Sequence, residues 1–267
     1  MADFTAKDVQ RLRQVTGAGM MDAKRALTEA GGDFDAATRR LQERGLASAN
    51  KRSDRENTEG AVALATSGTA AALVWLRSET DFVAKSPEFV KLANAIAEAV
   101  VAEGDEGTGR FEEAINELKV ALKENIELGR VVRFEAGPDE VLDSYLHVQS
   151  DRGVNGVLVL LRNGTPEVAH DVAVHVAFAR PSVLTRDEVP ESEVAEQRAL
   201  LETQTRNEGK PEQALPKIVE GKLGGWFKRV PGGVLLEQPY ARDDKVTVAA
   251  HLGGAEVVRF AQVEIGS

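Results

Sequence analysis

Two stretches of the chain decide its fold: residues 67–77, SGTAAALVWLR, and residues 152–162, RGVNGVLVLLR. They align without gaps at an offset of 85 positions, and each joins a glycine-containing turn to an apolar run. At the same offset, Ala61 falls on Leu146, which keeps the alternation of a preceding strand. A turn between two apolar strands is typical of a β-hairpin. The chain is therefore predicted to contain an internal repeat whose two copies each begin with a hairpin.

Later segments extend this repeat. A segment with helical character follows each hairpin, over residues 87–101 in the first copy and residues 166–179 in the second. Residues 131–134, VVRF, then recur as residues 257–260 at an offset of 126. Because this offset exceeds the first by 41, the second copy is predicted to contain an insertion of about that length.

The insertion is expected within residues 181–229, which lie between two prolines, Pro181 and Pro231. Two helices are predicted, over residues 191–208 and 212–227, joined by a Gly-Lys-Pro segment. An apolar stripe along the second helix, which the first helix can cover, predicts an antiparallel helical hairpin. The stripe consists of Leu215, Ile218, Val219, Leu223 and Trp226.

The first 46 residues have the pattern of three short helices. Thr5 and Asp8 have the spacing of a capping box at the start of the first helix. Asp22 is expected to cap the second helix and Gly45 to end the third. The polar residues 48–59 that follow predict a linker or an exposed helix. The first helix carries an expected apolar stripe of Val9, Leu12 and Val15.

Together these patterns predict an α+β protein in which helices pack against antiparallel sheets. The helical head and its linker are expected over residues 1–55, and the first core subdomain over residues 56–140. The second, related core subdomain is expected over residues 141–180 and 230–267. The helical hairpin, over residues 181–229, interrupts this second subdomain.

Composition and charge exclude several classes of protein. The chain has 267 residues, of which 42% are hydrophobic and 28% charged, which suits about two globular domains. It has no cysteine, so disulfide scaffolds, thiolate zinc sites and cysteine nucleophiles are excluded. The net charge is −10, with +3 on residues 1–55 and −13 on the remainder. An acidic body repels phosphate backbones, so we expect no direct nucleic-acid binding. The alternative hypothesis is that the basic head binds nucleic acid.

No targeting or membrane-spanning segment is expected. The first residues, MADFT, have neither the basic nor the apolar region of a signal peptide. The uncharged stretch over residues 60–76 is 17 residues long, whereas a spanning helix needs about 20. A cytoplasmic protein without membrane contact is the expectation.

The sequence contains no recognisable catalytic machinery. It lacks a phosphate-binding loop, a G-x-S-x-G elbow and an H-E-x-x-H pair. No nucleophile–base pair supports a hydrolase, so we predict no enzyme, no resident metal and no cofactor. Of the four histidines, His147 and His170 stay candidates for contacts with a partner.

Two segments have more than one interpretation. In residues 80–85, TDFVAK, Asp81 and Phe82 precede a helix with its own start signals. Asp81 can cap a turn while Phe82 packs as a hydrophobic staple, or both can be exposed on a binding loop. The adjacent methionines Met20 and Met21 likewise suit either core packing or contact with a partner.

Both segments resemble signature stretches of the bacterial elongation factor Ts family. Residues 16–27, TGAGMMDAKRAL, are similar to the first signature, and residues 79–85, ETDFVAK, to the second. The order of elements agrees with the family over nearly the whole chain. The resemblance implies a ubiquitin-associated-like three-helix head, two related core subdomains and an inserted hairpin able to mediate self-association. Ala23 stands where family members often have cysteine.

The resemblance also implies a function. Members bind elongation factor Tu carrying GDP, disturb its magnesium site and so speed GDP release, which allows reloading with GTP. In this chain the residues that match the magnesium-displacing segment are Thr80, Asp81, Phe82 and Val83. The residues expected to contact the partner are Met20, Met21, His147 and His170. The alternative from another class is a nucleic-acid-binding translation accessory that uses the basic head.

Overall fold

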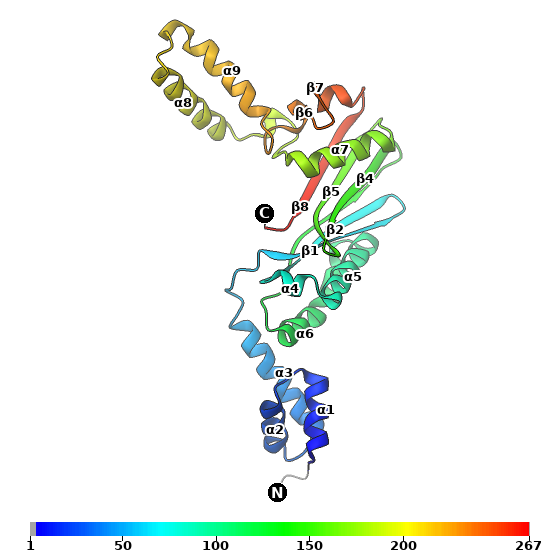
Figure 1. Cartoon of the computed structure of the whole chain (residues 1–267). Helices are drawn as coiled ribbons and strands as arrows, with labels where there is room; N and C mark the ends of the chain where they lie inside the picture. The colour runs from blue at the N-terminus through cyan, green and yellow to red at the C-terminus, as the bar shows by residue number, and fades with distance from the viewer. Residues whose placement is uncertain (1–3, 267) are drawn as a thin grey trace.

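The computed structural model describes residues 4–266. The molecule is elongated, with a helical head at one end, two sheet-containing units in the middle and a helical hairpin at the other end (Figure 1). Its sheets are small and antiparallel and helices lie against them, so the α+β class is confirmed. Within the described residues, no helix has the length and apolar character needed to cross a bilayer.

The head contains three helices packed around a small apolar core. They are α1 (Ala6–Thr16), α2 (Met20–Glu29) and α3 (Phe34–Asn50). The capping box at the start of α1 is present, because Thr5 accepts from the Asp8 N–H while the Asp8 carboxylate accepts from the Thr5 N–H. The buried side chains of this core are Val9, Leu12, Ala23, Ala26, Leu27, Ala37 and Leu41.

Three expectations for the head are wrong. Val15 does not extend the apolar stripe, because it is 63% exposed. Asp22 does not cap α2; the N-cap is Gly19, and Asp22 pairs with Arg25 in the first turn instead. Gly45 does not end α3. A Cβ there would lie 2.7 Å from Cγ1 of Val120, so the missing side chain lets α3 pack closely against α6 (Glu112–Leu122).

The first unit has the strand order β1-β2-β3, with every pair antiparallel. The strands are β1 (Glu59–Ser67), β2 (Ala70–Ser78) and β3 (Glu127–Glu135). Between β2 and β3 the chain forms α4 (Asp81–Ala84), α5 (Pro87–Glu103), a 3₁₀ segment (Asp105–Phe111) and α6. Helix α5 covers one face of the sheet. The core there includes Val74, Leu76, Phe89, Ile96 and Val100.

The second unit repeats this plan with the strand order β4-β5-β8. Its strands are β4 (Glu140–Gln149), β5 (Arg152–Arg162) and β8 (Glu256–Glu264), and α7 (Pro166–Ala179) covers one face. Short elements precede β8: β6 (Pro239–Tyr240), β7 (Asp243–Thr247) and α10 (Val248–His251). The core under α7 includes Val157, Val159, Leu161, Val172 and Val176.

The two sheets pack face to face through their other surfaces. Leu73 of β2 and Leu158 of β5, which correspond in the repeat, both lie in this shared core. Gly153 and Gly156 lie in β5 and not in a turn, so the prediction of a glycine turn in the second copy is wrong. The turn is formed by residues 150–151. The two glycines serve the close approach of the sheets, because a Cβ at either would collide with the first unit.

The recurrence of the VVRF sequence, residues 131–134, as residues 257–260 corresponds only in part to equivalent positions in the two units. Val132 and Val258 both face the core between the sheets. Phe134 lies in that core, whereas Phe260 packs on the α7 side of its own sheet. The pairing of β5 with β8 shifts register beside Val258. Such a bulge turns the following side chains to the other face.

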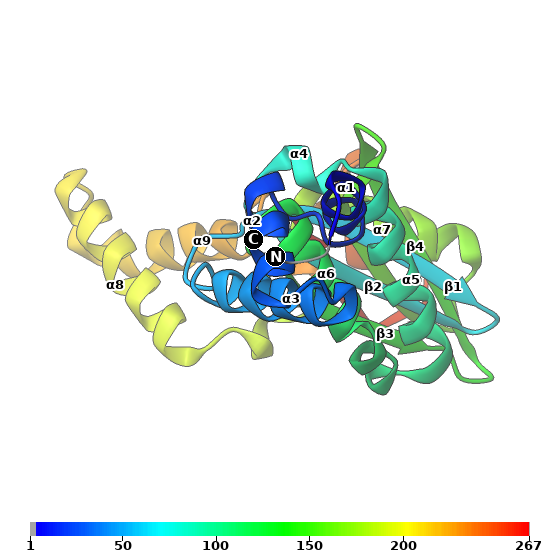
Figure 2. The ribbon, with the colours of Figure 1, turned by 90° about the horizontal axis from the view of Figure 1, so that it is seen from below.

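The helices α8 (Glu191–Asn207) and α9 (Leu215–Phe227) lie side by side and project from the second unit (Figures 1 and 2). Leu201 meets Val219 and Leu223 between them. At the base of this projection, the buried Gln238 donates to the backbone oxygen of Arg229 at 3.0 Å. Its own Oε1 is bonded to Nε2 of the buried His175 at 3.1 Å.

Candidate functional site

The TDFV segment forms one helical turn, whereas a binding loop was one of the two interpretations that the sequence left open. Helix α4 (Asp81–Ala84) follows directly after β2, and its N-cap is Thr80, whose hydroxyl accepts from the Val83 N–H at 3.4 Å. Ala84 is buried and Val83 packs against the core of the first unit. These two inward side chains leave the opposite side of the turn facing solvent.

Phe82 lies on that solvent-facing side. Its side chain is 83% exposed. The hydrophobic-staple interpretation is therefore wrong, because a staple would bury the ring against the following helix. An exposed phenylalanine on a short, fixed turn is available for contact with another molecule.

Asp81 stands beside Phe82 and is charged at neutral pH. The Lys85 ammonium lies 2.5 Å from the Asp81 carboxylate. This hydrogen bond holds the pKa of Asp81 below its ordinary value, with the positive charges of Lys85 and Arg152 acting in the same direction. Arg152 belongs to the second unit but reaches the first one. There it donates to the backbone oxygen of Gly60 and to the carboxylate of Glu59, at the start of β1.

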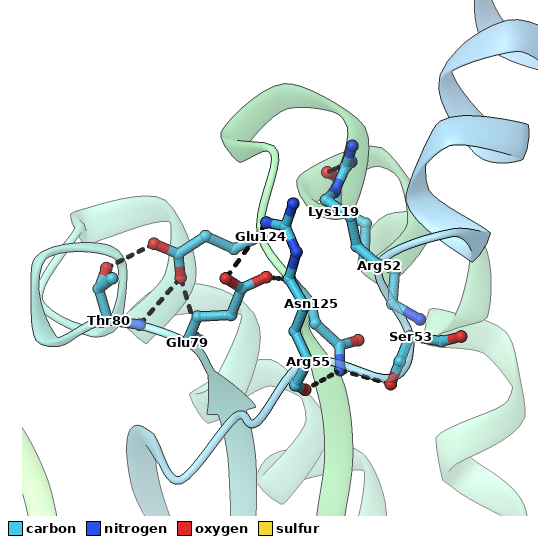
Figure 3. Close-up of polar contacts among 8 residues, drawn as sticks. All are labelled: Arg52, Ser53, Arg55, Glu79, Thr80, Lys119, Glu124 and Asn125. Carbon is cyan, nitrogen blue, oxygen red and sulfur yellow. Dashed lines mark hydrogen bonds and ion pairs between the residues drawn. The ribbon is translucent and has the colours of Figure 1, made fainter.

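A polar network lies directly behind α4 (Figure 3). The carboxylate of Glu124, which follows α6, accepts from the backbone N–H groups of Glu79 and Thr80, both at 3.1 Å. Its second oxygen accepts from the Thr80 hydroxyl at 2.5 Å. Every one of these bonds joins the segment after α6 to the two residues that directly precede α4.

The same network reaches the linker of the head. The buried Asn125 donates from its side chain to the backbone oxygens of Ser53 at 3.0 Å and Arg55 at 2.9 Å. Its backbone N–H donates to Glu79 at 2.7 Å, and Arg55 lies 3.4 Å from the other oxygen of Glu79. Thus the linker, the end of β2 and the start of α4 share one set of bonds (Figure 3).

The methionines of the head are both on the surface. Met20 is 47% exposed and Met21 is 74% exposed, so the core-packing interpretation is wrong. They begin α2, and the exposed Val15 lies near the end of α1. Figure 1 shows that this part of the head is separate from α4 along the length of the molecule.

The two candidate histidines lie on β4 and α7 of the second unit. His147 is exposed on β4, opposite Asn155 in the register of the sheet. His170 on α7 lies with Nδ1 2.9 Å from the carboxylate of Asp143. The structure does not bring either of them into the network behind α4. Within residues 4–266, no cluster of three histidine or carboxylate side chains could hold a metal ion.

Comparison with known proteins identifies the family. The family described as Elongation factor TS matches residues 79–267, which include α4, the later part of the first unit from α5 to β3, and the whole second unit. The chain belongs to the elongation factor Ts family. It is 45% identical to Elongation factor Ts of Mycolicibacterium smegmatis over the whole of this chain and 99% of the relative. It is 46% identical to Elongation factor Ts of Acidothermus cellulolyticus, with the same coverage of both chains. Its role is therefore in translation elongation.

Sequence reasoning did not find the residues that hold this family's TDFV segment in place here. Glu124 lies 44 positions from Thr80, and Asn125 lies 70 positions from Arg55. Hydrogen bonds between such distant residues leave no local periodicity or capping pattern. The remaining signal is a Glu-Asn pair between the end of a helix and a strand, which by itself indicates only a polar connection.

Proposed function

We propose that this chain binds elongation factor Tu carrying GDP and speeds the release of GDP by disturbing the partner's magnesium site. The chain itself carries out no covalent chemistry. Support comes from membership in the elongation factor Ts family together with one observation: a fixed turn that exposes Phe82 beside the charged Asp81. Thr80 caps this turn and Val83 packs beneath it, so both act by holding the pair outward.

The physical basis is a competition for the groups that hold the nucleotide. Backbone N–H groups, a lysine and a magnesium ion bind the phosphates of a bound nucleotide. An aromatic ring and a carboxylate inserted beside these groups weaken nucleotide binding without touching the nucleotide. Because coupling between two ligands is reciprocal, GDP must weaken binding of the factor by the same ratio.

Other parts of the chain supply docking contacts in this proposal. The head over residues 1–55, with a ubiquitin-associated-like arrangement, contacts the partner through Met20 and Met21. His147 and His170 belong to the second core subdomain, which faces another part of the partner. The hairpin over residues 181–229 is available for self-association. The site of action is the cytoplasm, where translation takes place.

Release of fluorescently labelled GDP from elongation factor Tu tests the proposal. Small amounts of this chain are expected to speed release many-fold in the presence of excess unlabelled nucleotide. A pull-down of the partner is expected to weaken when excess GDP is added, as reciprocity requires. A release rate that stays at its spontaneous value over a wide range of factor concentration would refute the proposed function.

A further inference from the structure

We propose that Glu124 is the positioning residue for α4, the element that presents Asp81 and Phe82. The inference rests on the proposed function for its kinetic consequence, whereas its structural part concerns the free chain alone. The side chain of Glu124 points to Thr80, at the start of the turn (Figure 3). It acts through Thr80 and does not itself meet the partner.

Helix α4 cannot hold its own shape. It has four residues, and a single helical turn is unstable in water because nucleation fixes several dihedral angles for very few hydrogen bonds. Its inward contacts come only from Val83 and the small Ala84. External anchors must therefore decide whether Phe82 is presented at one angle or at many.

Glu124 has the geometry of an anchor for the residues before α4. One carboxylate oxygen accepts from two successive backbone N–H groups, those of Glu79 and Thr80. The other oxygen accepts from the Thr80 hydroxyl. Hydrogen bonds to a charged acceptor are stronger than those between neutral groups. Three such bonds on adjacent donors fix both the position and the direction of the chain as it enters α4.

The Thr80 hydroxyl connects Glu124 to the turn itself. This hydroxyl gives its hydrogen to Glu124 and keeps a lone pair for the Val83 N–H. Glu124 thus selects the hydroxyl orientation that caps α4. Without the carboxylate, the hydroxyl is free to rotate and the cap is weakened.

At the other end, Asp81 and Lys85 are paired within the turn. Lys85 is exposed and on the same short segment, so this pair cannot fix α4 relative to the rest of the fold. Glu124, in contrast, follows a helix that packs against the head and the sheet. It links the start of α4 by side-chain hydrogen bonds to a rigid part of the molecule.

The test compares Glu124→Ala with Glu124→Gln and with the control Glu140→Ala. Glu140 also accepts from a backbone N–H, that of Gly137 at 3.0 Å, but in the second unit. Hydrogen exchange of the free chain should show faster exchange at the α4 amides in Glu124→Ala, with α5 unchanged. GDP release from elongation factor Tu at saturating factor should slow about tenfold, the scale expected for lost bonds to a carboxylate.

The half-saturating concentration should change much less, because the docking surfaces remain intact. Glu124→Gln keeps an acceptor for the two N–H groups and should recover part of the rate, and Glu140→Ala should match the parent. Equal α4 exchange and an equal saturated rate in a folded Glu124→Ala would overturn the inference. A parallel loss of docking and melting temperature would also overturn it, since that indicates only a structural role.

Thr80→Val provides a second variant if Glu124→Ala does not fold. It removes the hydroxyl but leaves both backbone N–H groups bonded to Glu124, and Thr80→Ser restores the hydroxyl. Faster α4 exchange in Thr80→Val and recovery in Thr80→Ser support the inference, and unchanged exchange in Thr80→Val contradicts it. Failure of the parent chain to speed GDP release would refute the proposed function, while the exchange experiment would still decide the positioning role.

Discussion

Gly153→Ala tests how the two sheets are held together. Gly153 lies on β5, where the second sheet faces β1 of the first. A Cβ added at Gly153 would collide with the backbone oxygen of Val62 and would lie 2.7 Å from Cδ1 of Leu146. A backbone oxygen in a strand cannot move aside as the end of a side chain can, so the sheets must separate locally.

Such overpacking typically costs about 1–3 kcal/mol. For a chain of this size that corresponds to a fall in melting temperature of roughly 2–12 °C. Gly156→Ala should cost less, because its added Cβ would meet Cδ2 of Leu73 at 2.5 Å and that side chain can shift.

Thermal unfolding followed by circular dichroism measures both effects. Gly221→Ala on the exposed side of α9 is the control, because a Cβ there has no neighbouring atom within 4 Å. That change should raise stability by roughly 0.5–1 kcal/mol through helix propensity. A Gly153→Ala protein with the same melting temperature as the parent would refute the close approach of the sheets.

Three further predictions concern other parts of the chain. Met20→Ala with Met21→Ala should weaken binding to elongation factor Tu by about 1–3 kcal/mol without changing the melting curve, because both side chains are exposed; a lowered melting temperature would contradict this. Replacement of residues 191–225 by a short Gly/Ser linker should leave cooperative unfolding of the sheet units intact, and a loss of cooperativity would show that the projection is needed for folding. Burial lowers the pKa of His175 below its ordinary value of 6.5, so the unfolded chain takes up the proton first as pH falls. Stability should therefore be full above pH 6.5 and decline below it, and His175→Phe should remove this part of the pH dependence in urea titrations.

Local patterns predicted most of the elements, because their causes are local. Thr5 and Asp8 form the predicted capping box, and the helices predicted over residues 87–101 and 166–179 are present as α5 and α7. The apolar runs predicted two hairpins, and the structure has them as β1 with β2 and β4 with β5, although β5 begins earlier than the expected glycine turn allowed. These features depend on residues a few positions apart, so they can be predicted from a single sequence.

Glycine was the least predictable residue. Gly17 ends α1 in a left-handed conformation, which is a local role of glycine. Gly45, Gly153 and Gly156 instead mark places where another helix or sheet comes close. A glycine that turns the chain and a glycine that admits a neighbour look alike until the neighbour is known.

In the candidate site, too, the features with local causes were predictable and those set by tertiary contacts were not. The sequence indicated that Asp81 and Phe82 precede a separately started helix but left their exposure open. The exposure of Phe82 depends on which side of α4 the core takes, and that is decided by Val83 and Ala84. The role of Glu124 depends on a contact made across the tertiary fold, which local patterns do not encode.

The most direct test of the account is the rate of GDP release from elongation factor Tu at saturating concentrations of an Asp81→Ala, Phe82→Ala variant. Full burial of a phenylalanine is worth roughly 1.5–3 kcal/mol, and Phe82 is 83% exposed in the free chain. The account therefore predicts a fall of about tenfold or more in the saturated release rate. Binding to nucleotide-free partner should fall less, and Phe178→Ala, at another exposed phenylalanine, should leave the rate unchanged. A folded double variant that releases GDP as fast as the parent would contradict the account.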